Sequence, residues 1–280
     1  MKLDLSVVGP PAEPKLAATI VLLRDSDAGP EVFCVVRSGK SQFLAGALVF
    51  PGGKLDAEDR AWADELEASP TEQNTSWRDP RPLPHASALA VAAIRETLEE
   101  ADIALCEPDA PADQLRESLR AQLLTHTSLR AALTPHGLRP ALAALVPMAR
   151  WITPTREPRR FDTAFFVARA PAAQHGRHDD HETVGSTWAT PRALLERWEQ
   201  DEIAMVPPTH ATLAWLAAQP DVAAALAHAR TLSLAPLCPE LVPGPPPSLV
   251  LPGDPAHSIA RAEHPYARRY TLHSTRFVPA

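Results

Sequence analysis

The chain has 280 residues, 45% of them hydrophobic, which allows a sizeable core in one large domain or two small ones. Its formal net charge is −7 at pH 7 with no long basic block, which argues against general binding to nucleic acid, because that requires a positive surface that displaces counterions from phosphates. The composition favours a small-molecule partner instead.

The N-terminal part of the chain predicts a small group of strands. Residues 16–24 (LAATIVLLR) and 32–37 (VFCVVR) are short apolar runs separated by turn-forming residues, a pattern typical of a β-hairpin. Residues 48–50 are a further strand candidate. The PGG sequence that follows contains Gly52 and Gly53 and is expected to end that strand.

A helix that carries three carboxylates is predicted after a long irregular segment. Residues 60–87 contain several prolines together with asparagine and aspartate, which suits an irregular insertion better than a core element. Residues 86–101 (ASALAVAAIRETLEEA) have apolar residues on one side at helical spacing, and Glu96, Glu99 and Glu100 cluster elsewhere. A carboxylate-bearing helix is therefore expected to follow a glycine loop.

The rest of the chain alternates predicted helices with predicted strands. Helices are expected at residues 113–133, 191–200, 208–218 and 221–229, and strands at residues 144–152, 162–169 and 183–189. Residues 239–255 are so rich in proline that an extended tail is predicted, and residues 270–278 are a candidate last strand. The simplest prediction is a single α/β domain over residues 1–280, with a core at about 16–218 and a proline-rich tail at 239–280.

Three cysteines, Cys34, Cys106 and Cys238, are far apart and odd in number, which fits neither a disulfide framework nor the paired spacing of a zinc site. A reducing, cytoplasmic setting is therefore expected. The N-terminal residues carry an acid early and lack an apolar stretch before a small-residue cleavage site. No run approaches the roughly 20 apolar residues that span a bilayer. Neither export nor membrane insertion is predicted.

The sequence that carries chemistry is FPGGKLDAED at residues 50–59, followed later by RETLEEADI. Residues three and four apart are neighbours on a helix, so Glu96, Glu99 and Glu100 can present three carboxylates to one space. Such crowding is repulsive unless a cation is bound, and Mg²⁺ prefers carboxylate oxygens and bridges to substrate phosphates. The glycine pair upstream lets the backbone approach those phosphates. Taken alone, RETLEE is also typical of a solvated helix face with an ion pair between Arg95 and Glu99.

Together the two segments resemble the Nudix hydrolase family, whose box reads glycine, five residues, glutamate, seven residues, then Arg-Glu-apolar-x-Glu-Glu-x-Gly-apolar. Gly53 would be the box glycine, and Arg95 with the three glutamates matches the second half letter for letter. Three departures stand out. Asp59 takes the place of the first glutamate, 35 residues (60–94) replace the seven-residue spacer, and Asp102 replaces the closing glycine.

These departures leave the carboxylate helix intact. The longer spacer must bulge outward, because it cannot remain a single loop-helix turn. Asp102 is expected to end the helix in the left-handed conformation that glycine would adopt, which aspartate tolerates better than most residues. Thr97 also stands where an aliphatic residue is usual.

The long spacer makes the chain similar to the branch of eukaryotic peroxisomal coenzyme A diphosphatases, which carries an insertion at this place. Further likeness lies in residues 37–59 (RSGKSQFLAGALVFPGGKLDAED), 151–154 (WITP) and 159–168 (RRFDTAFFVA), and it covers roughly residues 16–218. The resemblance implies an α/β class fold, the Nudix α/β/α sandwich with a mixed sheet, an insertion inside the box and a helical C-terminal extension. It also implies Mg²⁺- or Mn²⁺-dependent hydrolysis of coenzyme A or acyl-coenzyme A to adenosine 3′,5′-bisphosphate and a phosphopantetheine product.

The resemblance also implies roles for the box residues. Glu99 and Glu100 are expected to bind the metal, with Glu96 completing the site or orienting the water. Arg95 is expected to pair with Asp59 or Glu99 and to hold the loop against the helix rather than touch substrate, because an arginine among carboxylates is already engaged.

The general base stays open at this stage. Glu182, in the polar loop HGRHDDHETVG, resembles a position where family members often place an additional catalytic or metal-binding glutamate, and a solvated loop acid is an equal alternative. His178 and His181 lie in the same loop, but a spacing of three residues in a loop is weak evidence for a transition-metal site.

Substrate contacts are expected from guanidinium groups and from the glycine backbone. Arginine clamps phosphates bidentately, and coenzyme A carries a 3′-phosphate that would reward such a cluster. The candidates are Arg37, Gly52, Gly53, Arg159 and Arg160, with Arg156 beside the last two. Solvated loop charges are an equal alternative for Arg156, Arg159 and Arg160.

Two sets of aromatic residues have open roles. Trp62 and Trp77 in the insertion could cover an adenine or an acyl chain, or could simply anchor their loop. Phe161, Phe165 and Phe166 are expected in the core or in a pocket wall.

Two other functions stay open beside the coenzyme A reading. One is hydrolysis of ADP-ribose or another nucleoside diphosphate derivative, because fold and family do not settle substrate. The other is a nucleotide-binding module without catalysis, which Asp59 and the altered box end leave open. Residues 239–255 could also clasp a neighbouring subunit in a homodimer.

Overall fold

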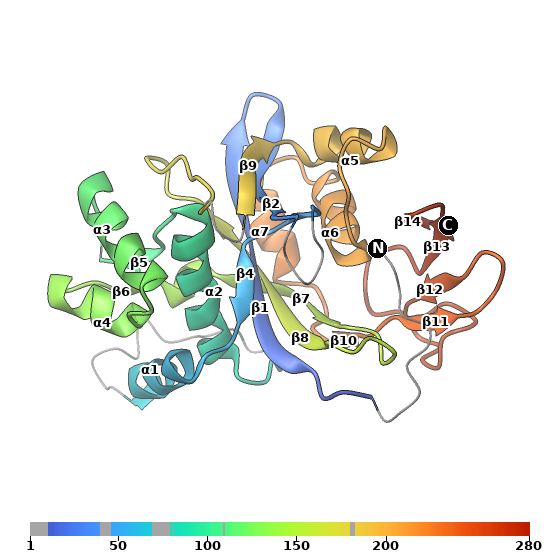
Figure 1. Ribbon diagram of the computed structural model, residues 1–280, viewed down its shortest axis with the longest axis horizontal. Helices are drawn as coiled ribbons and strands as arrows, with labels where there is room; N and C mark the ends of the chain where they lie inside the picture. Colours follow the sequence, from blue (N-terminus) through green and yellow to red (C-terminus); the bar gives the residue numbers. More distant parts are fainter. Residues whose placement is uncertain (1–10, 40–45, 69–78, 80, 109, 180–182) are drawn as a thin grey trace.

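The computed structural model describes residues 11–39, 46–68, 79, 81–108, 110–179 and 183–280. Its centre is an eight-stranded mixed sheet in which β1 (Lys15–Ser26) runs parallel to β8 (Phe161–Arg169) and antiparallel to β2 (Gly29–Arg37) (Figure 1). The other strands of this sheet are β3 (Leu48–Val49), β4 (Gly52–Lys54), β7 (Val146–Ile152), β9 (Thr183–Ala189) and β10 (Pro236–Leu237). The expected mixed sheet of an α/β fold is confirmed.

Strand β1 is buried on both faces, and its side chains divide between two cores. Ala18, Ile20 and Leu22 belong to one apolar cluster, whereas Val21 and Leu23 belong to the other. This division follows from the two-residue period of a strand, which sends successive side chains to opposite faces. A nearly continuous apolar run in the sequence therefore marks a central strand covered on both sides.

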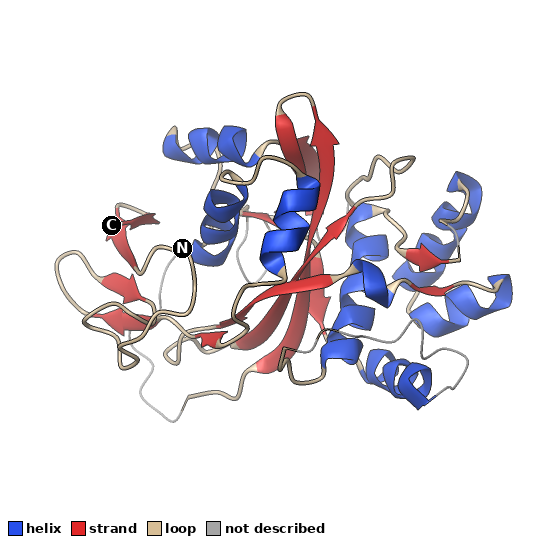
Figure 2. Cartoon of the chain, turned by 180° about the vertical axis from the view of Figure 1, so that it is seen from behind, coloured by secondary structure: helices blue, strands red, loops and turns tan. Residues whose placement is uncertain are grey.

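Separate groups of helices cover the two faces of the sheet (Figure 2). The first face carries α1 (Ala57–Ala68), α2 (Ala86–Ala101), α3 (Asp113–Leu124) and α4 (Leu129–Leu133), with the short strands β5 (Cys106–Glu107) and β6 (Arg139–Pro140) and the 3₁₀ turns η1 (Thr134–His136) and η2 (Leu142–Ala144) nearby. The second face carries α5 (Pro191–Glu199), α6 (Pro207–Leu216) and α7 (Val222–Ala229). The layers form the expected α/β/α sandwich.

The structure differs from the sequence prediction at the glycine pair and in the insertion. The strand predicted over residues 48–50 is β3, which ends at Val49 before the PGG sequence, but Gly52 and Gly53 then form most of a further strand, β4, which pairs antiparallel with β1. The first part of the predicted irregular insertion is helix α1, whose buried residues Trp62, Ala63 and Leu66 recur at helical spacing and join the first core. The prolines that suggested an irregular segment come after this helix in the sequence.

The predicted helix over residues 113–133 is also wrong, because it is two helices. Helix α3 ends before Thr125, and α4 begins after Ser128, whose side-chain oxygen accepts a hydrogen bond from the Ala131 amide. A serine at this position satisfies one of the free amides at the start of a helix, so it favours a new beginning. Helix α2, by contrast, has the predicted bounds.

The proline-rich C-terminal segment is not the extended tail that its composition predicts. A four-stranded antiparallel sheet forms there from β11 (Glu240–Val242), β12 (Ser248–Val250), β13 (Arg269–His273) and β14 (Arg276–Pro279). Leu249, Tyr270 and Phe277 from this sheet are buried in the second core. The predicted last strand over residues 270–278 is a hairpin of two strands.

No helix among the described residues is long and apolar enough to cross a bilayer.

Candidate active site

The candidate site is built on the last two turns of α2, where it meets strand β4. The helix lies against the first core, and Ile94 and Leu98 are buried there, which fixes the direction of the glutamates on its other side. Thr97 is fully buried, and its hydroxyl donates to the Ala93 carbonyl at 2.6 Å, so this polar residue is tolerated inside the core.

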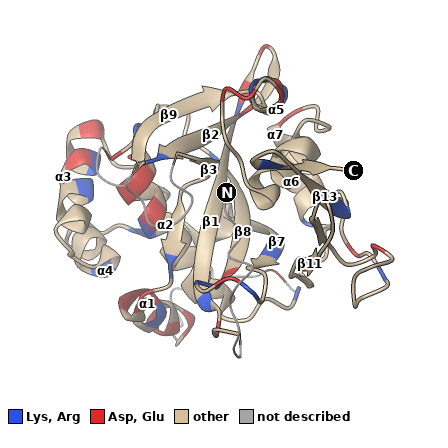
Figure 3. Ribbon diagram, turned by 45° about the vertical axis from the view of Figure 1, so that its right-hand side comes forward, with Lys and Arg blue, Asp and Glu red and all other residues tan. Residues whose placement is uncertain are grey.

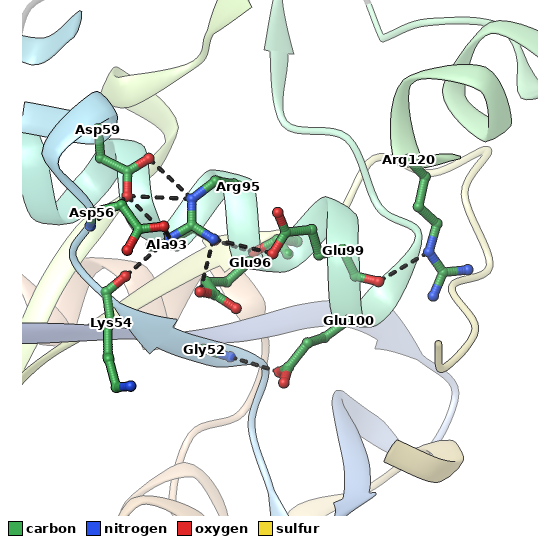
Figure 4. A network of polar contacts seen from close by, with 11 residues as sticks. Gly52, Lys54, Asp56, Asp59, Ala93, Arg95, Glu96, Glu99, Glu100 and Arg120 are labelled. Atoms are coloured by element: carbon green, nitrogen blue, oxygen red, sulfur yellow. Dashed lines mark hydrogen bonds and ion pairs between the residues drawn. The ribbon is translucent and has the colours of Figure 1, made fainter. Parts of the chain in front are cut away.

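Arg95 joins the two separated halves of the box (Figure 4). Its Nε donates to Asp59 Oδ1 at 3.0 Å, and its Nη2 donates to Asp59 Oδ2 at 3.0 Å and to the Lys54 carbonyl at 2.9 Å. Its Nη1 donates to Glu96 Oε1 at 2.9 Å and to Glu99 Oε2 at 3.1 Å. The predicted pairing is present with both Asp59 and Glu99, and a planar guanidinium is suited to hold several carboxylates at once.

The glycine strand approaches the glutamates closely. The Gly52 amide donates to Glu100 Oε2 at 2.9 Å. A Cβ atom added to Gly53 would lie 2.2 Å from Glu96 Oε1, a distance that real Cβ atoms do not reach. A side chain at this position would therefore displace Glu96, so the close approach requires glycine.

The site concentrates negative charge in a place that disfavours it. Burial raises the pKa of the Glu96 carboxyl to about 7; Arg95 opposes this shift, whereas the neighbouring carboxylates add to it. Burial also raises the pKa of Glu99, again opposed by Arg95. Glu99 and Glu100 lie in the last turn of α2, where the helix dipole is negative. The acidic end of α2 is visible in Figure 3. Additional positive charge would stabilise this arrangement.

The three glutamates suit a hard divalent cation by their chemistry, because such ions prefer carboxylate oxygens. In the part of the chain that the structure describes, no three acidic, histidine or cysteine side chains converge on one point as a closed metal centre would require. Glu96 and Glu99 turn toward Arg95, and Glu100 turns toward the Gly52 amide. A cation at this place would compete with Arg95 for two of the carboxylates.

A cavity of about 2040 Å³ opens beside these residues. The three glutamates, Gly52 and Gly53 line it, and so do Arg37 and Arg159. Its volume is large enough for a nucleotide with a long substituent, since pockets for ligands of drug size span about 300–1,000 Å³.

A protein-family model for the NUDT19 Nudix domain matches residues 15–216 of the chain. The chain belongs to the Nudix hydrolase family. The acyl-coenzyme A diphosphatase NUDT19 of Gallus gallus is 31% identical over 232 residues, which cover 65% of this chain and 61% of that protein. The Homo sapiens protein of the same name is 28% identical over 220 residues, which cover 64% of this chain and 58% of that protein. The match thus spans less than two thirds of these relatives' own length.

A solved Nudix structure supports the same assignment. The crystal structure of a Nudix hydrolase from Alicyclobacillus acidocaldarius superposes with a TM-score of 0.67 at 30% sequence identity. The superposition covers 80% of this chain and 99% of that chain. The Nudix fold predicted from the box is confirmed.

Some residues predicted as substrate contacts lie at the Nudix cavity and others do not. Arg37 and Arg159 line it, whereas Arg160 donates to the carbonyls of Thr153 at 3.0 Å and Ala12 at 2.8 Å. These two bonds give Arg160 a backbone-binding role, so we leave it out of the proposed substrate contacts. The Arg156 side chain is exposed.

The aromatic residues follow the structural alternative. Trp62 is 6% exposed and packs in the first core, so it anchors α1 rather than covering a ligand. Phe166 is fully buried, whereas Phe161 and Phe165 line the cavity, as expected for core and pocket wall. Trp77, His181 and Glu182 lie outside the described residues, so their predicted roles stay predictions.

Asp102 has a role that the sequence showed only in part. Its φ of 53° and ψ of 39° confirm the predicted left-handed end of α2. Its buried carboxylate also accepts from Arg116 Nε at 3.3 Å and Arg177 Nε at 3.0 Å. Arg120 lies 3.9 Å from the same carboxylate, and its Nε donates to the Glu99 carbonyl at 2.9 Å. The residue that replaces the box glycine thus ties α3 and the segment around Arg177 to the end of the carboxylate helix.

Proposed function

We propose that this Nudix protein hydrolyses the diphosphate bond of coenzyme A or acyl-coenzyme A, giving adenosine 3′,5′-bisphosphate and a phosphopantetheine product. The observation that carries the proposal is the acidic end of α2 beside the Gly52–Lys54 strand, in a cavity that Arg37 and Arg159 also line. The names of the NUDT19 relatives support this choice of substrate over other nucleoside diphosphate derivatives.

The residues have distinct proposed tasks. Glu96, Glu99 and Glu100 would hold Mg²⁺ or Mn²⁺, which when bound neutralises charge on the diphosphate and activates water. Arg95 keeps Asp59 and the β4 backbone in register with the helix. Arg37 and Arg159, at the cavity wall, would bind substrate phosphates through their guanidinium groups. Glu182 stays the proposed additional carboxylate for proton transfer.

The test is hydrolysis of coenzyme A, acetyl-coenzyme A, ADP-ribose and NADH in parallel, with Mg²⁺, Mn²⁺ or EDTA, and with products identified by mass. Glu100→Gln is compared with Glu67→Gln, the same change at an exposed position on α1. We expect metal-dependent release of adenosine 3′,5′-bisphosphate that falls at least about 100-fold in Glu100→Gln and is retained in Glu67→Gln.

The other outcomes are equally clear. Cleavage of ADP-ribose or NADH alone would keep the Nudix chemistry and reject coenzyme A as substrate. Nucleotide binding with no turnover of any compound would identify a binding module, the remaining alternative.

A further inference from the structure

The cavity of the proposed diphosphatase extends beyond the segment that carries the Nudix family match. That match ends at residue 216, whereas strands β11 to β14 span residues 240–279. Leu249 of β12 and Phe277 of β14 line the same cavity as the three glutamates. The added C-terminal sheet therefore supplies part of the wall of the site.

The part of the cavity wall that includes the C-terminal sheet is apolar. Leu249 and Phe277 are 3% and 4% exposed, and they share the second core with Trp151, Phe165 and Met205, which also line the cavity. All five side chains lie on the face of the sheet opposite α2. We call these five residues the far wall.

Arg276, which lines the cavity next to Phe277 in the chain, is already engaged. Arg276 Nη1 lies 2.7 Å from Asp201 Oδ1, and its guanidinium lies 4.8 Å from the centre of the Trp198 ring. Its charge is thus balanced by an acid and satisfied by an aromatic face. The phosphates of a nucleotide would gain little here, since burying a charge without a partner is costly.

Coenzyme A thioesters have two chemically different halves. The nucleotide half carries several phosphates, whereas an acyl group on the other half is an uncharged hydrocarbon chain. Arg37 and Arg159 line the same cavity and can bind the phosphates of the nucleotide half, which leaves the apolar far wall for the uncharged half. Each methylene removed from water there tightens binding by up to about fourfold.

We propose that the far wall is the subsite for the acyl chain of the substrate, so that the C-terminal sheet sets the preference for acylated over free coenzyme A. The inference rests on the proposed function for the position of the diphosphate.

The test is a ratio of dissociation constants for octanoyl-coenzyme A and coenzyme A, measured by titration calorimetry on the full chain in EDTA, so that no turnover is needed. We expect the wild type to bind octanoyl-coenzyme A at least tenfold more tightly. Phe277→Ala and Met205→Gln should each reduce this ratio by about five- to tenfold. Phe166→Ala, the same truncation in the first core, should leave the ratio unchanged.

Two results would overturn the subsite: a wild-type ratio near one, or a wild-type ratio kept by both far-wall variants. Met205→Gln preserves side-chain length, so it answers the question even where the Phe277 truncation prevents folding. Because the assay measures binding alone, it separates the two proposals. If the ratio of dissociation constants falls in the far-wall variants as expected but no hydrolysis occurs, the diphosphatase is rejected and the subsite is kept. If hydrolysis occurs but the far-wall variants keep the wild-type ratio, the diphosphatase is kept and the subsite is rejected.

Discussion

Asp102 offers a direct test of how this chain compensates for losing the box glycine. The left-handed backbone conformation at this position is most favourable for glycine, whereas the buried carboxylate of Asp102 is stabilised by its ion pairs. Substitutions here therefore separate the backbone effect from the charge effect. Asp102→Asn keeps tolerance of the left-handed conformation and removes the charge. Asp102→Gly removes the charge and the conformational cost, and Asp102→Ala removes the charge while adding that cost.

The expected magnitude follows from the partners. Removing one member of a buried ion pair costs about 3–5 kcal/mol when the other charge is left without compensation. After loss of the Asp102 charge, Arg116, at 10% side-chain exposure, still pairs with Asp113. Arg120, at 6%, still donates to the Glu99 carbonyl. Arg177 is 60% exposed and contributes little. We therefore expect Asp102→Asn to lower the unfolding free energy by about 2–3 kcal/mol.

The unfolding free energy of Asp102→Gly should exceed that of Asp102→Ala by roughly 1 kcal/mol, because glycine adopts the left-handed conformation without a Cβ clash. Urea unfolding followed by circular dichroism measures these differences, and the melting temperature of Asp102→Asn should fall by about 4–9 °C. The reasoning is refuted if Asp102→Gly is more stable than the wild type, since the backbone would then outweigh the ion pairs.

Three further changes test other parts of the structure. Gly53→Ala should lower the rate of coenzyme A hydrolysis at least about tenfold, because the new Cβ displaces Glu96. Gly185→Ala is the control, because a Cβ at that position would meet its nearest neighbour at 3.9 Å, and it should keep the rate. Equal rates in the two variants would contradict the close approach of Gly53 to Glu96. Trp62→Ala should lower the unfolding free energy by about 3–4 kcal/mol in urea titrations, and an unchanged midpoint would place α1 outside the core. Burial lowers the pKa of His210 to about 4, so the unfolded chain binds the proton more tightly and stability is lost as pH falls from about 6.5 toward 4. Urea titrations at pH 4.5 and 7 should show a smaller difference for His210→Gln than for the wild type, and an equal difference would assign the acid sensitivity to other groups.

Elements with a strong local pattern were predictable from the sequence. The apolar run in residues 16–24 and the helical period in residues 86–101 both reflect burial. The run lies within strand β1 (Lys15–Ser26), and the helix has its predicted bounds. Strand β4 was not predictable, because Gly52 and Gly53 have little strand preference and are held in place by pairing with β1. The C-terminal sheet was hidden for a different reason: its prolines suggest a tail, and β12 pairs with β13 across the intervening residues 251–268.

The candidate site shows the same division. The glutamates, Arg95 and Asp59 belong to two short motifs, so their grouping was predictable once both were seen as one box. The arginines around Asp102 come from α3 and from the segment near Arg177, and no local pattern marks them as its partners. Leu249 and Phe277 reach the cavity from beyond residue 216 and look like ordinary core residues in the sequence.

The long spacer is tolerated because the box is held together through space rather than along the chain. Arg95 fixes Asp59 and the Lys54 carbonyl against α2 by direct hydrogen bonds, so the site geometry is independent of how many residues intervene. Lengthening a closed loop from seven to 35 residues costs only about 1.4 kcal/mol by (3/2)RT ln(35/7). Burial of Trp62 from α1 contributes about 2–3 kcal/mol, which offsets that cost. The insertion therefore stabilises the fold by packing in the first core while leaving the carboxylate helix unchanged.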